Sequence, residues 1–459
     1  MPPRACPDRK KWETYVAFST PGRPRMTRTG WIVAVFAPAV VVVAASSAVF
    51  RPVGGVTGSP TPRPADTHVA ATVGRAVGQS GCSSVGCHGG VGGPGVARWV
   101  TSAHEWSAAD PHRRAFAVLE EPLAVAMMAR LYPGEPAKQR ASSAARCLAC
   151  HTNPTLAAST DPHDISLRSE GVSCEACHGS ASGWLGPHTG VAGRAAGYEA
   201  GRMAKLYDLG ERALACAGCH VGAPATDTLP LRDMNHDMIA AGHPRLNFDF
   251  ATYQFMLPRH WDEKDRAPDF EARAWLVGRI VHAETACLLT ADRANRKEAA
   301  LPEFAEYSCV ACHHRIGDPE AKYPASDVKR LGSLPWQPIW PVTTNVPALK
   351  DVAAAMRGRR PAPNTPDLAT KAAAELARLR TDPLRLPAEH WMKPLPDGVW
   401  DRDLTEQVFH AAAALERTRG AQADGAPFAT AAAKLRLTRG EIGFHVAPDV
   451  AAAVRALVK

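Results

Sequence analysis

The chain has 459 residues, with 53 Lys and Arg against 45 Asp and Glu and a formal net charge of +8. Residues 1–48 hold seven of the basic residues and only two acidic ones, so the rest of the chain is weakly basic. Because Lys and Arg form no long run, the charge gives no support to a nucleic-acid-binding protein. The 36 Gly and 39 Pro exceed the usual combined share and predict much coil.

The first predicted element is an export segment at the N-terminus. Residues 31–50 are apolar and uncharged and follow Arg23, Arg25 and Arg28, so the basic flank is expected to stay in the cytoplasm. Small residues around Ala48 offer a cleavage site. About 20 apolar residues can also span a bilayer.

Residues 1–50 are therefore predicted to be either a cleaved signal or an uncleaved membrane anchor, and Met26 is an alternative start. Residues 51–78, rich in Gly, Pro and Thr, are predicted to form a flexible linker. In both cases the remaining chain faces an extracytoplasmic compartment.

Five times a pair of cysteines is followed directly by a histidine. The copies are Cys147, Cys150 and His151; Cys174, Cys177 and His178; Cys216, Cys219 and His220; Cys309, Cys312 and His313; and a stretched copy, Cys82, Cys87 and His88. C-x-x-C-H is the attachment signature of c-type haem. The cysteines form thioethers to the porphyrin and the histidine is the proximal iron ligand. The sequence thus predicts about five covalently attached haems c.

Paired cysteines also occur in zinc sites, redox-active pairs and disulfides, none of which requires a histidine directly after the second cysteine. Zinc sites need two pairs that close a tetrahedron, and thioredoxin-like pairs occur once in a domain. Two cysteines remain outside the motifs. Cys6 precedes the export segment, and Cys287 lies in an apolar helical stretch, where a buried, inert thiol is expected.

Two helical stretches are predicted between the motifs. Residues 110–128 have helical character, with Pro122 expected to divide them. Residues 268–294 form the longest candidate helix, which is apolar on two faces and therefore expected to be buried or to lie against porphyrin. No segment shows sustained strand alternation. We expect a mainly α fold with much coil and a haem-packed core, in a pentahaem domain of residues 79–345.

A C-terminal α-helical tail follows, over residues 346–459, after a loop at 322–341. Helices are predicted at 347–357, 365–380, 404–419 and 428–438. The tail contains no cysteine, so packing or docking is its expected role.

The occupant of the sixth iron position decides between electron transfer and catalysis, because a second imidazole blocks substrate binding. His68, His390, His410 and His445 are far from any motif and are expected at the surface. Nine histidines remain as candidates, each with a structural role as the alternative: His104, His112, His163, His188, His236, His243, His260, His282 and His314. His243 stands out because Gly242 and Pro244 restrict its backbone.

Several longer motifs resemble the multihaem cytochrome c family of the cytochrome c-554 type, over roughly residues 80–345. They are Trp106 with residues 110–112; residues 171–179 with Trp184 and His188; residues 235–238 with 242–246; and residues 302–307 with 312–314. The resemblance implies a helical, haem-stacked fold and periplasmic electron transfer. It also implies distal ligation by His112, His188, His236, His243 and His314. The tetrahaem members lack this chain's additional motif.

The sequence thus predicts a periplasmic multihaem electron carrier, soluble or tethered to the inner membrane by residues 31–50, with redox proteins of the periplasm or inner membrane as partners. No catalytic residue is predicted. The alternative is a haem enzyme acting on hydroxylamine, nitric oxide or nitrite at one five-coordinate haem, as some relatives do. A third hypothesis gives the haems only a structural role.

Overall fold

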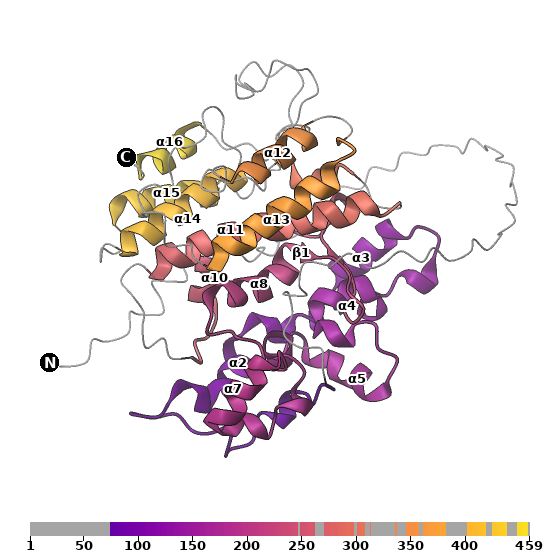
Figure 1. Cartoon of the computed structure of the whole chain (residues 1–459), viewed down its shortest axis with the longest axis vertical. Helices are drawn as coiled ribbons and strands as arrows, with labels where there is room; N and C mark the ends of the chain where they lie inside the picture. Colours follow the sequence, from indigo (N-terminus) through magenta and orange to yellow (C-terminus); the bar gives the residue numbers. More distant parts are fainter. Residues whose placement is uncertain are drawn as a thin grey trace, which may run out of the picture. The chain divides into compact units, whose positions relative to one another are not determined.

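The computed structural model describes residues 74–246, 248–261, 270–297, 301–307, 313, 336, 346–357, 361–381, 402–418, 425–437 and 448–457. Helices predominate among them (Figure 1), at 65% of the residues, which confirms the mainly α class. The only strands of the described residues, β1 (Gly222–Ala223) and β2 (Arg232–Asp233), pair antiparallel with Gly222 opposite Asp233. These residues belong to one unit, Asp66–Lys459.

The predicted export segment lies outside the described residues, as does the linker up to residue 73. Within the described ranges, no helix has both the length and the apolar character needed to cross a membrane.

The region that carries the first four motifs, residues 74–261, consists of short helices joined by coil. Its α-helices are α2 (Ser102–Ala109), α3 (Pro122–Leu131), α4 (Ala145–His151), α5 (Pro162–Leu167), α6 (Cys174–His178), α7 (Val191–Glu199), α8 (Leu209–His220), α9 (His236–Ala241) and α10 (Phe250–Met256). Single 3-10 turns lie between them: η1 (Gln79–Gly81), η2 (Arg98–Thr101), η3 (Pro111–Arg114), η4 (Ala117–Glu120), η5 (Pro136–Lys138), η6 (Ala141–Ser143), η7 (Pro154–Leu156), η8 (Arg168–Glu170), η9 (Ala181–Gly183) and η10 (Pro187–Thr189).

Proline divides the stretch that was predicted to be helical at 110–128. The structure has η3, η4 and then α3, which begins at Pro122. A proline lacks the backbone N–H that a helix interior needs but is well suited to the first turn. The predicted break at Pro122 is confirmed.

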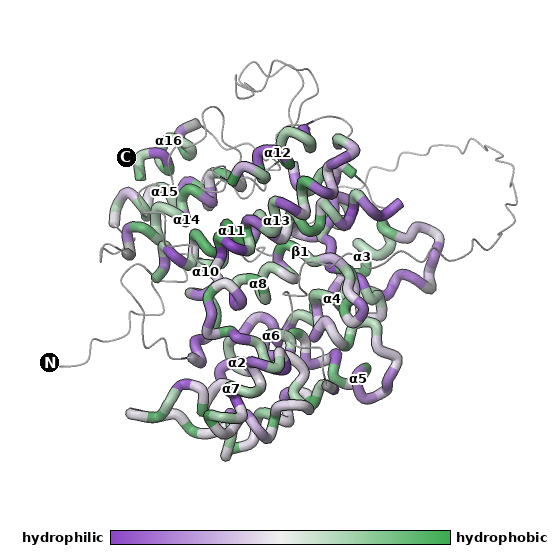
Figure 2. Tube along the Cα trace, viewed as in Figure 1, coloured by the Kyte–Doolittle hydropathy of each residue, from purple (hydrophilic) through white to green (hydrophobic). Residues whose placement is uncertain are grey.

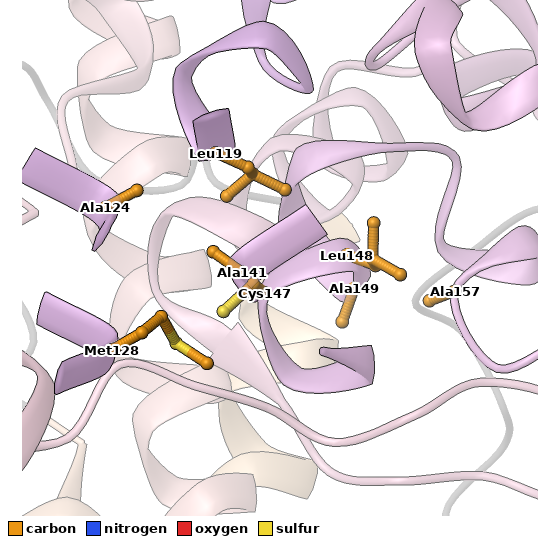
Figure 3. Packing of buried hydrophobic residues seen from close by; sticks show 8 residues of the cluster. All are labelled: Leu119, Ala124, Met128, Ala141, Cys147, Leu148, Ala149 and Ala157. Atoms are coloured by element: carbon orange, nitrogen blue, oxygen red, sulfur yellow. The ribbon is translucent and has the colours of Figure 1, made fainter. Parts of the chain in front are cut away.

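The apolar clusters of this region are small. Figure 3 shows one around α4, where Leu119, Met128 and Leu148 pack with Cys147 and four alanines. A second joins α3 to α9 through Met127, Met238 and Ala241. Most of these side chains are short, so the clusters bury little apolar area.

The rest of the described chain consists mainly of longer helices. These are α11 (Phe270–Asn295), α12 (Pro347–Met356), α13 (Thr365–Thr381), α14 (Arg402–Thr418), α15 (Ala426–Leu437) and α16 (Pro448–Ala456), with a 3-10 turn η11 (Phe304–Glu306) after α11. The predicted helices agree with α11 to α15; α16 was not predicted. Figure 1 shows α11 and α13 running side by side, and they are in contact. Apolar segments recur along both (Figure 2).

Buried ion pairs connect these helices to the motif-bearing region. Arg380 of α13 binds Glu284 of α11 at 3.0 Å and Glu211 of α8 at 2.9 Å. Arg293 of α11 pairs with Asp233 at 2.6 Å and also with Glu306.

Two side-chain predictions for this part of the chain have different outcomes. Cys287 is fully buried in α11, as expected. His410 was expected at the surface, which is wrong, because its ring lies 3.2 Å from Asp249 with the side chain only 14% exposed. The tail packs here against α10, a tertiary contact with no signal in the local sequence. His68, His390 and His445 lie outside the described residues.

Candidate functional site

Three of the five motifs form the last turns of short helices. Cys147 to His151 ends α4, Cys174 to His178 is the whole of α6, and Cys216 to His220 ends α8. Residues three positions apart share one face of a helix, so the two thiols of each motif lie on the same side, with the histidine beside the second thiol.

The stretched motif has an irregular backbone instead. Cys82 follows η1, and the His88 backbone N–H donates to the Cys82 carbonyl at 3.1 Å. This bond closes a loop that brings His88 back beside the first cysteine despite the two additional residues. In the fifth motif His313 is described, whereas Cys309 and Cys312 lie outside the described residues.

Each of the five motif histidines faces one other histidine. The ring centroids are separated by 6.1 Å for His88 and His188, 6.1 Å for His220 and His112, 6.2 Å for His151 and His243, 6.4 Å for His178 and His260, and 6.3 Å for His313 and His236. No histidine occurs in two of these pairs.

This spacing agrees with the geometry of two imidazoles on one metal. A metal–nitrogen bond of about 2.0–2.1 Å, and about 1.1 Å from ring centre to nitrogen for C–N bonds of about 1.33 Å, give centroids about 6.2–6.4 Å apart. The pairs therefore fit one haem iron each.

Hydrogen bonds to Nδ1 orient most of these rings. Nδ1 of His151 donates to the Ala115 carbonyl at 2.7 Å, and Nδ1 of His243 to the Pro244 carbonyl at 2.8 Å. The corresponding acceptors are the Trp99 carbonyl for His88, at 2.9 Å, Asp110 for His112, at 2.9 Å, and the Leu185 carbonyl for His188, at 2.5 Å. A ring whose Nδ1 carries the proton presents the lone pair of Nε2 to a metal.

Burial keeps several of these rings neutral, as metal ligation requires. It lowers the pKa of both His178 and His220 to about 4. The pKa values of His151 and His243 are also lowered by burial. His112 differs: burial lowers its pKa, but the hydrogen bond to Asp110 and the negative charge of Asp110 together outweigh this and leave the pKa raised.

Cysteines of different motifs also meet. The Cys82 and Cys174 thiols lie close enough to interact, which raises the pKa of Cys82 and lowers that of Cys174. A similar interaction with Cys150 lowers the pKa of Cys219 to about 6. Numbered in chain order, the stretched motif at Cys82 is the first of the five. It thus lies against the third motif (Cys174 to His178), and the second motif (Cys147 to His151) lies against the fourth (Cys216 to His220).

The structure brings four of the five predicted distal histidines, His112, His188, His236 and His243, each to a motif histidine. His314 lies outside the described residues. Sequence reasoning missed His260, which faces His178. His260 was a candidate, but unlike the other four it does not lie within one of the extended motifs that resemble the family. Its neighbours Pro258 and Trp261 alone did not indicate a ligand.

The other candidates have structural surroundings. His104 donates from Nε2 to the Gly89 carbonyl at 3.0 Å, and His163 is exposed beside Asp164. His282 is half-buried in α11 beside Phe248, and its Nδ1 has no hydrogen-bond partner in the described part of the chain.

Comparison with known proteins points to the same chemistry. Residues 81–179 match the family described as cytochrome c554 and c-prime. No curated protein and no solved structure matches the chain. The matched segment carries three of the five motifs and includes His112. This match over residues 81–179 supports a c-type cytochrome of the cytochrome c-554 type, with covalently bound haem and a role in electron transfer.

Proposed function

We propose that this chain is a periplasmic pentahaem electron carrier in which every iron is held between two histidines. The observation that carries the proposal is the one-to-one pairing of five motif histidines with five others, at 6.1–6.4 Å between ring centroids. Cys82, Cys87, Cys147, Cys150, Cys174, Cys177, Cys216, Cys219, Cys309 and Cys312 attach the five porphyrins. The bound haems supply one-electron redox chemistry.

The protein's contribution would be the paired imidazoles, which would hold each iron between two oriented rings. His88, His151 and His243 each have Nδ1 fixed by a backbone carbonyl, so little movement is needed when the iron changes its charge. Filled axial positions also keep substrates away from the metal. Both effects favour electron transfer over catalysis.

Contacts between motifs suggest the order in which electrons pass. The Cys82–Cys174 and Cys150–Cys219 contacts join the first motif to the third and the second to the fourth. Burial raises the pKa of Cys177 to about 12, with a smaller contribution from nearby Cys216 that joins the third motif to the fourth.

The fifth pair adjoins the second, because His236 begins α9 and His243, which pairs with His151, follows the end of that helix. The resulting order of proximal histidines is His88, His178, His220, His151 and His313. Electrons would enter or leave at the first and last of these.

Location and partners follow from the sequence. The apolar segment 31–50 with its basic flank supports export, as a cleaved signal or as a tether to the inner membrane. Redox proteins of the periplasm or of that membrane are the proposed partners. An enzyme acting on nitrogen compounds would need one iron with a free side, whereas each of the five motif histidines already faces a second ring.

The mass of the holoprotein tests the number of haems. We expect it to exceed the polypeptide mass by five haems, and a pyridine haemochrome assay should give the same number. A matched variant, Cys82→Ser with Cys87→Ser, should lose one haem. Four haems in the wild type would mean that the stretched motif attaches none, and fewer than four would contradict the proposal.

His243→Ala tests distal ligation at one iron. The cysteines and the proximal His151 are unchanged, so haem staining on a denaturing gel should remain complete. Electron paramagnetic resonance should show one low-spin haem converted to high spin. His163→Ala is the matched control, because His163 is exposed and faces no motif histidine. A spectrum of His243→Ala identical to wild type would exclude His243 as a ligand.

A further inference from the structure

The five distal histidines differ in how firmly the chain holds them. Three lie within or at the start of a helix: His112 in η3, His188 in η10 and His236 at the start of α9. His243 follows the left-handed residue Gly242 (φ 118°) that ends α9. His260 lies in a stretch without regular structure, beyond the end of α10.

The backbone shows the same difference. The N–H groups of His188 and His243 donate to the carbonyls of Trp184 and Met238 at 3.0 and 2.9 Å. The N–H groups of His112 and His236 donate to Asp110 and Glu303 at 2.9 and 2.7 Å. Among the described residues, the N–H of His260 has no such acceptor.

The ring of His260 is also less constrained than the rings of His112, His188 and His243. Its Nδ1 contacts the Pro258 carbonyl at 3.3 Å, whereas the Nδ1 contacts of His112, His188 and His243 measure 2.5–2.9 Å. Hydrogen bonds weaken as they lengthen beyond about 3 Å. Hydrogen bonding of this kind fixes a ligand ring and raises its basicity, so the iron–nitrogen bond of His260 is expected to be weaker than those of His112, His188 and His243. His236 is held instead through its backbone N–H, which donates to Glu303.

The neighbourhood of His260 allows its ring to move without loss of the fold. Trp261 lies beside the ring, at 5.2 Å between centroids, and the Arg212 guanidinium lies over Trp261 at 5.3 Å. Arg212 itself donates to the Leu206 carbonyl at 2.7 Å and to Gln254 at 3.0 Å. These contacts hold Trp261 to α8 and α10, so a rotation of the His260 side chain leaves its neighbour in position.

We propose that the iron between His178 and His260 exchanges His260 for a small uncharged ligand, while the other four irons keep both imidazoles. The inference rests on the proposed function, since it takes His260 as an axial ligand. In the exchange the iron–nitrogen bond breaks, the imidazole leaves neutral with its electron pair, and the incoming ligand donates a pair in its place. No electron or proton is transferred.

Carbon monoxide added to the reduced holoprotein tests this exchange. We expect one equivalent to bind per chain, at a rate that stops rising with carbon monoxide concentration because dissociation of His260 becomes limiting. His260→Ala should bind one equivalent at least tenfold faster, and no second equivalent. His188→Ala, the matched control, should bind one equivalent rapidly and a second at the wild-type rate.

Three results would overturn the inference: a wild type that binds no carbon monoxide, a wild type that binds several equivalents, and a His260→Ala variant that binds a second, slow equivalent. The haem count and the spin state of the same preparations distinguish failure of the ligand exchange from failure of the proposed function. Five low-spin haems without carbon monoxide binding would refute only the exchange. A high-spin haem in the untreated oxidised protein would refute ligation by two histidines throughout.

Discussion

Two regions of this protein are stabilised in different ways. In residues 74–261 the helices are short, coil joins them, and half of the buried residues in the cluster around α4 are alanine. In α11, by contrast, large side chains such as Trp275, Leu276 and Ile280 are almost completely buried against the neighbouring helices. The apolar clusters described in the first region are small, and we propose that the porphyrins add apolar surface there.

This difference predicts which interactions stabilise each region. Packing of long apolar helices stabilises α11 and α13 through the hydrophobic effect. The motif-bearing region should depend on its cofactors, as small metal-binding domains depend on their metal. The two regions meet at buried ion pairs, which link helices that are far apart in the sequence.

The largest expected effect is the loss of haem. In a chain produced without haem attachment, residues 74–261 should fail to fold, whereas α11, α12 and α13 should keep their helical structure. Limited proteolysis followed by mass spectrometry should find cleavage throughout the first region and protection within α11, α12 and α13. Equal protection of both regions would contradict the comparison.

The next effect concerns Arg380, whose guanidinium binds Glu284 and Glu211 across three helices. Arg380→Ala leaves Glu284 without a cation although its side chain is only 3% exposed. Removing one partner of a buried pair typically costs about 3–5 kcal/mol. Urea unfolding of the holoprotein should show this loss, whereas Arg378→Ala, at an exposed position of the same helix, should change little. Equal effects of the two substitutions would contradict a stabilising role for the buried pair.

A change of pH should alter the free energy of unfolding by a slightly smaller amount. Burial raises the pKa of Glu284 from 4.5 to about 7, although Arg380 opposes the shift. The folded state therefore binds this proton more tightly than the unfolded state, so the stabilisation is complete below about pH 4.5 and is lost as pH rises through about 7. At about 1.4 kcal/mol per pH unit, the change amounts to about 3 kcal/mol.

Glu284→Gln should remove this dependence. The free energy of unfolding of the variant should fall less than that of wild type between pH 4.5 and 7, and Glu199→Gln, at an exposed site, should behave as wild type. Parallel pH profiles for Glu284→Gln and wild type would exclude Glu284 as the titrating group.

The sequence predicted the elements whose causes are local. Pro122 marked the start of α3, and the two apolar faces of residues 268–294 predicted the buried helix α11. The motif histidines followed from covalent chemistry, and Gly242 marked the turn before His243. In each case a few neighbouring residues determine the conformation.

The pairing of the histidines could not be predicted, because it depends on contacts between distant residues. His236 and His243 are seven positions apart but face different motif histidines, since α9 ends at Ala241 and Gly242 turns the chain. His260 carries no local motif and is recognised only by its distance from His178. His410 was wrongly expected at the surface for the same reason.

The spin state of the oxidised holoprotein tests the central claim, five irons each held by two imidazoles, most directly. Electron paramagnetic resonance of a sample with a known haem count should show only low-spin haem, with signals that integrate to five per chain. Near-infrared magnetic circular dichroism should show charge-transfer bands of bis-imidazole ligation alone. A high-spin signal equivalent to one haem per chain would contradict the account and favour an enzyme with an open iron.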